Sequence, residues 1–295
     1  MQLAIASGKG GVGKSTITAS LLYFLKDRYK LIAVDADAEA PNLGLLLGVE
    51  EWEEEREHIG AKIARINPES CILCGICYER CPYESIYIDE GTYVVNELTC
   101  EGCNVCGLVC PVPGTITLEQ ARSGVIRKAM TKYGFPIISA QLDVGRPESG
   151  KLVTEEKEWA KNLMDELNLE HMIVDSAAGI GCQVIASIGG ADSTILIAEP
   201  TPASLSDVQR AYKVVQHFRQ PAYLIINKAD INPGFTALRD WAETEGIPVI
   251  GEVPYDRAIP KSMSLLKPVV EAFPDSPASK ALREIAERIT KEILG

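Results

Sequence analysis

The sequence predicts an α/β fold with a doubly wound, mainly parallel sheet, into which a small α+β domain is inserted. Short aliphatic runs alternate with longer amphipathic segments along most of the 295 residues. Such alternation is typical of a parallel sheet with helices on both faces. A cysteine-rich stretch breaks the pattern in the first half of the chain. We therefore expect a discontinuous domain, residues 1–57 and 122–295, and an inserted domain, residues 58–121.

The expected elements follow from the aliphatic runs. The chain opens with a strand over residues 2–7, a glycine-rich loop, a helix over residues 14–29 and a strand over residues 31–37. Further strands are expected at residues 171–176, 193–199, 222–228 and 247–253, and further helices at residues 154–168, 203–218 and 279–294. Continuous aliphatic runs of about four to eight residues are typical of strands that are buried on both faces.

The composition argues against some classes of partner. The formal net charge is −12, whereas proteins that bind nucleic acid or anionic membranes need a basic surface. We therefore expect no nucleic-acid partner and no stable membrane anchoring. The acidic run from Glu50 is interpreted as a solvated surface, with a docking face for a basic redox partner as the alternative. The first residues lack the features of a signal peptide, so we expect a cytoplasmic protein.

A phosphate-binding loop follows the first expected strand. Residues 8–15 read GKGGVGKS and fit the pattern G-x4-G-K-[ST] between a strand and a helix. The backbone N–H groups of such a loop bind phosphate oxygens, its lysine (Lys14) reaches the β- and γ-phosphates, and its serine (Ser15) binds Mg²⁺. The expected nucleotide-binding residues here are Gly8, Gly10, Gly11, Val12, Gly13, Lys14, Ser15 and Thr16.

Three aspartates are candidates for the same site. Asp35 and Asp37 end one aliphatic strand and Asp175 ends another, and ligands bind at the C-terminal edge of such sheets. We expect Asp175 to hold Mg²⁺ together with Ser15, Asp35 to support the Mg²⁺ shell and Asp37 to position the attacking water. Each of these aspartates could instead cap a helix or a turn.

The loop resembles the deviant Walker A motif of the MinD/Mrp/ParA group of ATPases, which includes the nitrogenase iron protein, because Lys9 follows its first glycine. The resemblance covers roughly residues 1–47 and 125–295. It implies an ATP-dependent homodimer in which Lys9 reaches the phosphates bound by the partner. The catalytic residues would then be Lys9, Lys14, Asp37 and Asp175.

The same resemblance implies which residues sense the nucleotide and bind its base. Asp37 would lie in switch I, and DSAAGIG would be switch II, with Gly179 as the γ-phosphate sensor. Asn227 and Lys228 of INKAD would contact the base, and GEVPYD, which contains Pro254, would cradle it. NKAD is also similar to the guanine motif of GTPases. The residues alone therefore leave ATP and GTP open, and the family resemblance favours ATP.

Eight cysteines form a duplicated unit, C-x2-C-x2-C-x3-C-P, at residues 71–82 and 100–111. Each copy resembles a bacterial two-cluster ferredoxin, in which the fourth cysteine of one run ligates the other cluster. The resemblance implies one 4Fe–4S cluster on Cys71, Cys74, Cys77 and Cys110, and a second on Cys100, Cys103, Cys106 and Cys81. The alternative is zinc, but a zinc ribbon needs two C-x2-C pairs rather than two complete quartets.

The ninth cysteine, Cys182, follows Asp175 by seven residues. The nitrogenase iron protein has a cysteine at this spacing, which helps to bridge a cluster between subunits, but its second bridging cysteine has no counterpart here. We interpret Cys182 either as a thiol on switch II or as an ordinary buried cysteine.

Three hypotheses for function follow. The first is an ATP-hydrolysing dimeric switch that couples its nucleotide state to electron transfer through two 4Fe–4S clusters to a redox partner. The second is a carrier or scaffold of the Mrp type that delivers iron–sulfur clusters to an apo-protein. The third is a positioning ATPase similar to MinD or ParA, which the acidic charge of the chain disfavours.

Overall fold

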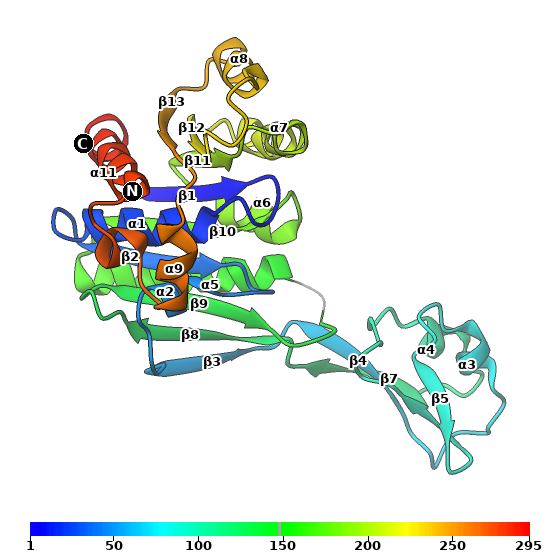
Figure 1. Cartoon of the computed structure of the whole chain (residues 1–295). Coiled ribbons are helices and arrows are strands. Elements are labelled where there is room, and N and C mark those ends of the chain that lie inside the picture. Colours follow the sequence, from blue (N-terminus) through cyan, green and yellow to red (C-terminus); the bar gives the residue numbers. More distant parts are fainter. Residues whose placement is uncertain (147–148) are drawn as a thin grey trace.

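The main body of the chain is built on one nine-stranded sheet (Figure 1). The computed structural model describes residues 1–146 and 149–295. The strand order is β13 (Val249–Val253), β12 (Ala222–Asn227), β11 (Ser193–Ala198), β1 (Gln2–Ser7), β10 (His171–Ala178), β2 (Leu31–Ala36), β9 (Pro136–Leu142), β8 (Gly124–Met130) and β3 (Glu54–His58). Neighbours from β13 to β9 are parallel, and β8 is antiparallel to β9 and β3. The predicted mainly parallel α/β sheet is therefore confirmed.

Helices cover both faces of this sheet (Figure 1). One face is packed by α1 (Lys14–Leu25), α2 (Leu43–Leu46), α9 (Ala258–Ser264), α10 (Val269–Ala272) and α11 (Pro277–Ile289), which continues into a π-helical turn (Thr290–Leu294). The other face is packed by α5 (Ser149–Leu167), α6 (Cys182–Ile188), α7 (Pro202–His217) and α8 (Ala237–Thr244). Successive strand residues alternate between the two cores, as Ala4 and Ile5 do. This alternation explains why the central strands are aliphatic at every position.

Two expected boundaries differ from the structure by several residues. The first helix ends at Leu25 instead of residue 29, because Leu25 is its last buried apolar residue and the N–H groups of Arg28 and Tyr29 bond back to the Leu25 carbonyl. The helix expected at residues 154–168 is already helical at Ser149. Strands β3, β8 and β9 extend the sheet beyond the strands predicted from the aliphatic runs.

Residues 61–121, called the arm below, lead away from the β3 and β8 edge of the main body (Figure 1). An antiparallel ladder of β4 (Ala61–Ile66) and β7 (Ile116–Ala121) carries two short helices, α3 (Ile76–Arg80) and α4 (Val105–Val109), and a hairpin, β5 (Ile86–Asp89) and β6 (Thr92–Val95). The arm has an apolar cluster of its own, which includes Ile63, Ala64, Ile86 and Val95. The division into domains at residues 58 and 121 stays a proposal.

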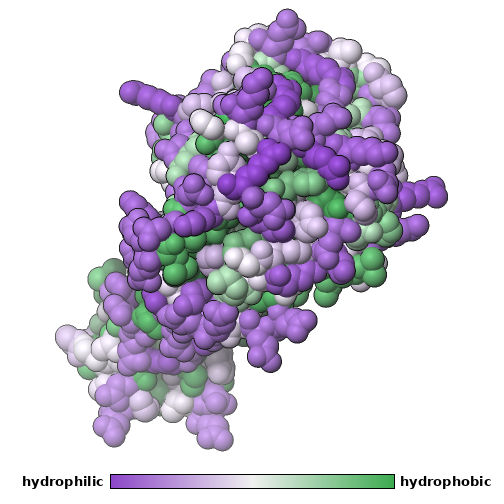
Figure 2. Space-filling model, turned by 90° about the vertical axis from the view of Figure 1, so that its left-hand side faces the viewer, coloured by the Kyte–Doolittle hydropathy of each residue, from purple (hydrophilic) through white to green (hydrophobic). Residues whose placement is uncertain are grey.

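The face of the molecule in Figure 2 is covered mostly by hydrophilic side chains, with smaller hydrophobic areas between them. Within residues 1–146 and 149–295, no helix is both long and apolar enough to cross a bilayer. The acidic run from Glu50 ends in the edge strand β3, on which Glu55, Arg56 and Glu57 are exposed. Charged side chains on an edge strand discourage pairing with another chain.

Candidate functional site: a phosphate-loop cavity and two cysteine hollows

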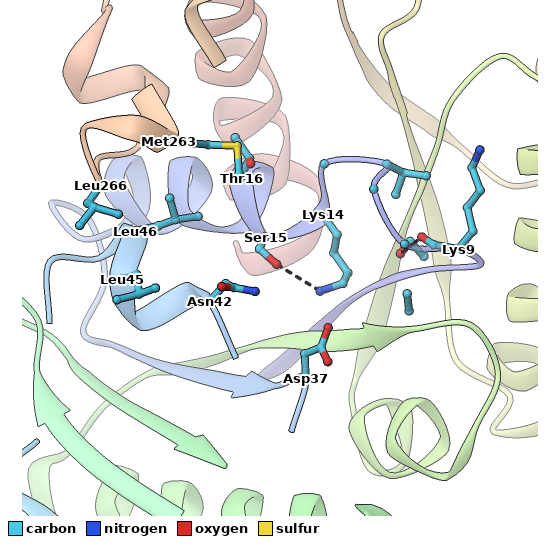
Figure 3. Close-up of a pocket in the computed structure, with 16 residues that line it drawn as sticks. Lys9, Lys14, Ser15, Thr16, Asp37, Asn42, Leu45, Leu46, Met263 and Leu266 are labelled. Carbon is cyan, nitrogen blue, oxygen red and sulfur yellow. Dashed lines mark hydrogen bonds between the residues drawn. The ribbon is translucent and has the colours of Figure 1, made fainter. Parts of the chain in front are cut away.

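A cavity of about 410 Å³ opens at the C-terminal edge of the sheet, where β1 passes into α1. Residues 9–16 of the glycine-rich loop line one side, and Asp37 and Asn42 face them. Figure 3 shows the Asp37 carboxylate facing the Lys14 ammonium, which is turned toward Ser15. Four apolar side chains close the remaining wall, Leu45, Leu46, Met263 and Leu266. A space with phosphate donors at one end and apolar walls at the other suits a nucleotide.

Lys14 and Asp175 form a buried ion pair beneath the loop. The Lys14 ammonium lies 3.0 Å from Asp175 Oδ1 and 3.5 Å from the Ser15 hydroxyl. Thr18 donates a second hydrogen bond to Asp175 Oδ1 at 2.7 Å. The other carboxylate oxygen, Asp175 Oδ2, is buried and has no hydrogen-bond partner among the described residues. A buried oxygen of this kind is a free acceptor for a cation or for a water bound to it.

Asp35 lies beside Asp175, because strands β2 and β10 pair these two residues. Its Oδ2 accepts from the Leu43 N–H at 2.8 Å, and its Oδ1 is buried without a partner in the described chain. Burial, and then the nearby Asp175 carboxylate, raise the pKa of Asp35 to about 8. Burial also raises the pKa of Asp37. The donor set of Ser15, Asp35 and Asp175 fits Mg²⁺, which prefers oxygen ligands and would stabilise the ionised carboxylates.

Lys9 points away from the cavity (Figure 3). Its ammonium lies 2.6 Å from Glu199 Oε1, at the end of β11, and the ammonium of Lys228 lies 3.0 Å from the other Glu199 oxygen. Lys228 also donates to the Gly11 carbonyl at 3.2 Å. Burial acts to raise the pKa of Glu199, but hydrogen bonds from the two lysines outweigh it and lower that pKa. Glu199 therefore holds Lys9 within its own chain.

Close packing fixes the backbone of the loop. Asn227 is buried and donates to the Val12 carbonyl at 2.6 Å, and a Cβ at Gly13 would lie 2.4 Å from the Asn227 amide nitrogen. A Cβ at Gly8 would lie 2.1 Å from the Asp207 carbonyl at the start of α7. Gly13 also has φ +92°, which strains any residue with a side chain. The sequence therefore needs glycine at both positions for local structural reasons.

The remaining predicted nucleotide-binding residues surround the loop less directly. Gly179 follows Ala178, which lines the cavity, and its N–H donates to the Ser7 carbonyl at 2.9 Å. Asn227 and Lys228 contact the loop from its outer side, and Pro254 begins the segment after β13. Five predicted residues are not among those that line the cavity: Gly8, Gly179, Asn227, Lys228 and Pro254. Their predicted contacts with a nucleotide stay predictions.

The arm gathers its eight cysteines into two hollows. One hollow is lined by Cys71, Cys74, Cys77 and Cys110, and the other by Cys81, Cys100, Cys103 and Cys106. Each hollow therefore combines three cysteines of one run with the fourth cysteine of the other run. The apolar residues Ile116 and Ile86 line the first and the second hollow, respectively.

The chemistry of the hollows fits thiolate ligands. All nine cysteines of the chain are free thiols. Burial, and then neighbouring cysteines of the same hollow, act to raise the pKa of Cys77 and of Cys106, so that thiolates at these positions would need the positive charge of a bound metal centre. The Ser85 N–H donates to Cys81 Sγ at 3.3 Å. In the part of the chain that the structure describes, no three His, Cys, Asp or Glu side chains are grouped to hold a single metal ion. A 4Fe–4S cluster takes its four thiolates at four different iron atoms.

Cys182 is exposed at the start of α6, so the alternative of an ordinary buried cysteine is wrong. A Cβ at Gly150, in the first turn of α5, would lie 3.0 Å from Cys182 Cβ. The thiol therefore lies where the segment after Gly179 meets the start of α5.

Comparison with known proteins supplies the family. The model of the CobQ/CobB/MinD/ParA nucleotide binding domain matches residues 3–269. The chain belongs to this family. An uncharacterized protein of Methanocaldococcus jannaschii is 30% identical over 293 residues, which cover 99% of this chain and 98% of that protein. An iron-sulfur cluster carrier protein of Pyrococcus abyssi is 27% identical and covers 99% of this chain and 86% of its own length.

Solved structures show the same fold. The septum site-determining protein MinD of Pyrococcus horikoshii, complexed with Mg-ADP, superposes with a TM-score of 0.61 at 18% identity and covers 100% of this chain and 98% of its own. For this CobQ/CobB/MinD/ParA family member, sequence reasoning missed Glu199 and the apolar wall of Leu45, Leu46, Met263 and Leu266. The available signal for Glu199 was an acidic residue at the end of an aliphatic run, which was also the signal for Asp175.

Proposed function

We propose that the chain is an ATP-hydrolysing dimeric switch that carries two 4Fe–4S clusters in its arm and couples its nucleotide state to electron transfer to a partner protein. The observation that carries the proposal is the sorting of the eight arm cysteines into two crossed quartets around two hollows. The same chain holds a complete phosphate loop in a family of nucleotide-binding domains. When bound, the clusters supply one-electron transfer and Mg²⁺ neutralises phosphate charge.

The residues of the cavity have distinct roles in this proposal. Lys14 exchanges its contact with Asp175 for the β- and γ-phosphates when the nucleotide enters, which leaves the Asp175 carboxylate for Mg²⁺. Asp37, whose carboxylate faces the Lys14 ammonium, orients the attacking water. Lys9 leaves Glu199 to reach the nucleotide of a second copy. The exchange costs little because Lys228 remains to pair with Glu199.

Contacts between the two parts of the chain give the proposed coupling a route. Gly145 packs on the Leu98 carbonyl, and Arg146 donates to the Glu97 carbonyl at 2.9 Å, just before Cys100 in the arm. Gly150, in the first turn of α5, meets Cys182, which begins α6 three residues after Gly179. A shift of the Gly179 loop with nucleotide would therefore reach the start of α5, while Gly145 and Arg146 join the main body to the arm.

Two other functions are alternatives. Relatives such as the Pyrococcus abyssi protein are named as iron-sulfur cluster carriers, which favours delivery of a cluster to an apo-protein. The fold is also that of the cell-division protein MinD, which leaves a positioning ATPase as a further alternative. Neither alternative accounts for two complete cysteine quartets. A carrier in particular has to release the cluster that it binds.

The first test is the composition and activity of the anaerobically purified protein. We expect about eight iron and eight sulfide per chain, together with ATP hydrolysis that Lys14→Ala abolishes without a loss of iron. Incubation with an apo-ferredoxin distinguishes the carrier hypothesis from the electron-transfer proposal. Retention of iron by the chain supports the electron-transfer proposal, whereas ATP-dependent appearance of holo-ferredoxin contradicts it. Absence of iron from the fresh protein contradicts both.

A further inference from the structure

The duplicated cysteine unit allows one hollow to be compared with the other. Residues 72–73, between the first two cysteines of the first run, are Ile and Leu, whereas the equivalent residues 101–102 are Glu and Gly. Gly102 has φ +62° and packs so tightly that a Cβ would lie 2.4 Å from the Lys62 carbonyl of β4. The loop of the second run is therefore covered by the ladder of the arm.

The equivalent loop of the first run is uncovered. Leu73 has φ +57°, a conformation that strains a residue with a Cβ and that the second run fills with glycine. The Leu73 side chain is 54% exposed and that of Ile72 is 63% exposed, beside the exposed Cys74. Two large apolar side chains are thus exposed to water, and one of them, Leu73, occupies a backbone conformation where glycine would fit better. Folding of the arm does not account for this choice.

These two residues lie at the end of the arm that is remote from the main body. The hollow of Cys81, Cys100, Cys103 and Cys106 includes Ala64, whereas the other hollow includes Ile66, farther along β4 from the main sheet. Figure 1 agrees, since α4 lies nearer to the main body and α3 lies toward the tip. The quartet of Cys71, Cys74, Cys77 and Cys110 is called the distal quartet below.

Charge indicates what kind of molecule covers Ile72 and Leu73. Residues 61–121 contain eight acidic and three basic side chains. One of the three basic residues, Arg65, is already paired with Glu97 and Glu119. Thiolate ligands would make this end of the molecule still more negative. An exposed apolar centre within a negative field is complementary to an apolar patch ringed by Lys and Arg.

We propose that Ile72 and Leu73 are the centre of a docking surface for a basic electron-transfer protein, which takes electrons from the distal quartet's cluster. In each transfer one electron leaves the reduced cluster and reduces the acceptor centre of the docked protein. The inference rests on the proposed function, because it requires a redox-active cluster at the distal quartet.

The test uses ferricytochrome c as a basic protein acceptor and hexaamminecobalt(III) as a small acceptor that needs no docking surface. Reduced holoprotein is mixed with each acceptor in a stopped-flow spectrometer. The variant Ile72→Ser/Leu73→Gly keeps the charge unchanged and relieves the strain at position 73. We expect it to reduce ferricytochrome c about tenfold more slowly than the natural chain, and to reduce hexaamminecobalt(III) at an unchanged rate.

Leu108→Gln is the matched control, because Leu108 is an apolar side chain that is 78% exposed on α4, the helix of the second cysteine run. It is expected to leave both rates unchanged. Equal ferricytochrome c rates for the natural chain and the Ile72→Ser/Leu73→Gly variant would overturn the proposal, as would a loss of rate confined to Leu108→Gln. Sedimentation of the natural chain and of the Ile72→Ser/Leu73→Gly variant tests whether a second copy of the chain covers this surface. A dimer of the natural chain that the double substitution dissociates would also overturn the proposal.

The same experiment separates this inference from the proposed function. Iron and sulfide are quantified in every variant before mixing. A natural chain that holds its iron, reduces hexaamminecobalt(III) and shows no effect of the double substitution overturns the docking surface alone. A natural chain without iron, or one that reduces neither acceptor, overturns both.

Discussion

The charged side chains beneath the phosphate loop are buried in pairs, which makes each of them dependent on its partner. Lys14 and Asp175 retain 7% and 0% exposure of their side chains. Removing a charge from water is costly, and its partner offsets that cost only while both are present. The loop is therefore stabilised in the absence of nucleotide by the same two side chains that would bind nucleotide and Mg²⁺.

Loss of one partner should destabilise the nucleotide-free protein more than loss of both. We expect Lys14→Met to lower the free energy of unfolding by about 3 kcal/mol, because the buried Asp175 carboxylate is left unpaired. The double variant Lys14→Met/Asp175→Asn should recover most of this loss. Urea unfolding of the natural chain, of Lys14→Met, of Asp175→Asn and of the double variant measures the coupling. Additive effects of the two substitutions would contradict a dependent pair.

The buried carboxyl groups should make stability fall as the pH rises. The pKa of Asp35 is raised from 3.8 to about 8, and burial also raises the pKa of Glu156 well above its usual value. The folded chain therefore binds more protons than the unfolded chain between about pH 4 and pH 8, and stability declines over that interval.

We expect urea unfolding of the Mg²⁺- and nucleotide-free protein to show this decline. Each of the two groups contributes a slope of at most about 1.4 kcal/mol per pH unit. Asp35→Asn should remove part of the slope, and Asp35→Asn/Glu156→Gln most of it. A natural chain whose stability rises steadily from pH 5 to pH 8 would contradict the assignment of protonated carboxyls.

At the scale of elements, the loop is fixed by the start of α7. Gly8 lies against the Asp207 carbonyl, whereas a Cβ at Gly10 would meet no atom within 4 Å. Backbone cannot move aside as a flexible side chain can. Packing therefore excludes a side chain at Gly8, whereas it leaves space for one at Gly10.

Gly8→Ala should lower the free energy of unfolding by about 1–3 kcal/mol, because the added methyl group forces α7 and the loop apart. Gly10→Ala is the matched control and should change it by less than about 0.5 kcal/mol. Both values come from urea unfolding without nucleotide. Equal effects of the two substitutions would show that packing on α7 does not select Gly8.

The central elements could be predicted from the sequence because their residues are buried on both faces. The first strand, residues 2–7, was predicted with the bounds that β1 has. The edge strand β3 was missed because its residues, EEREH, are mostly exposed and carry no apolar pattern. Strand β9 is buried, but it follows the interruption by the arm and is paired on one side with the antiparallel strand β8, which the sequence did not indicate either. Such strands form because they pair with segments that are distant in the sequence, and the hydrophobic periodicity of a single segment does not reveal this pairing.

At the scale of the whole molecule, the arm brings together cysteines that are distant in sequence. Cys110 joins the hollow of Cys71, which is 39 residues earlier in the chain, and Cys81 joins that of Cys100. The duplicated spacing was enough to predict this crossing through the resemblance to ferredoxins. The exposed Ile72 and Leu73, by contrast, required the structure, because an apolar pair between two cysteines does not by itself indicate exposure.

Double substitutions test the crossing. Cys71→Ser/Cys110→Ser alters one quartet and should leave about four iron per chain. Cys71→Ser/Cys81→Ser alters one ligand in each quartet and should lose iron from both. Iron analysis and EPR of the reduced proteins distinguish the two variants. If Cys71→Ser/Cys81→Ser instead kept more iron than Cys71→Ser/Cys110→Ser, each cysteine run would hold its own cluster.

If the nucleotide cavity and the cysteine quartets act together, the redox properties of the clusters should depend on the bound nucleotide. The holoprotein is titrated anaerobically, with EPR detection, without nucleotide, with MgADP and with a non-hydrolysable MgATP analogue. We predict that the ATP analogue shifts the midpoint potential or the line shape of at least one cluster relative to the nucleotide-free protein. Identical potentials and spectra in all three conditions, with nucleotide binding shown independently, would contradict the coupling.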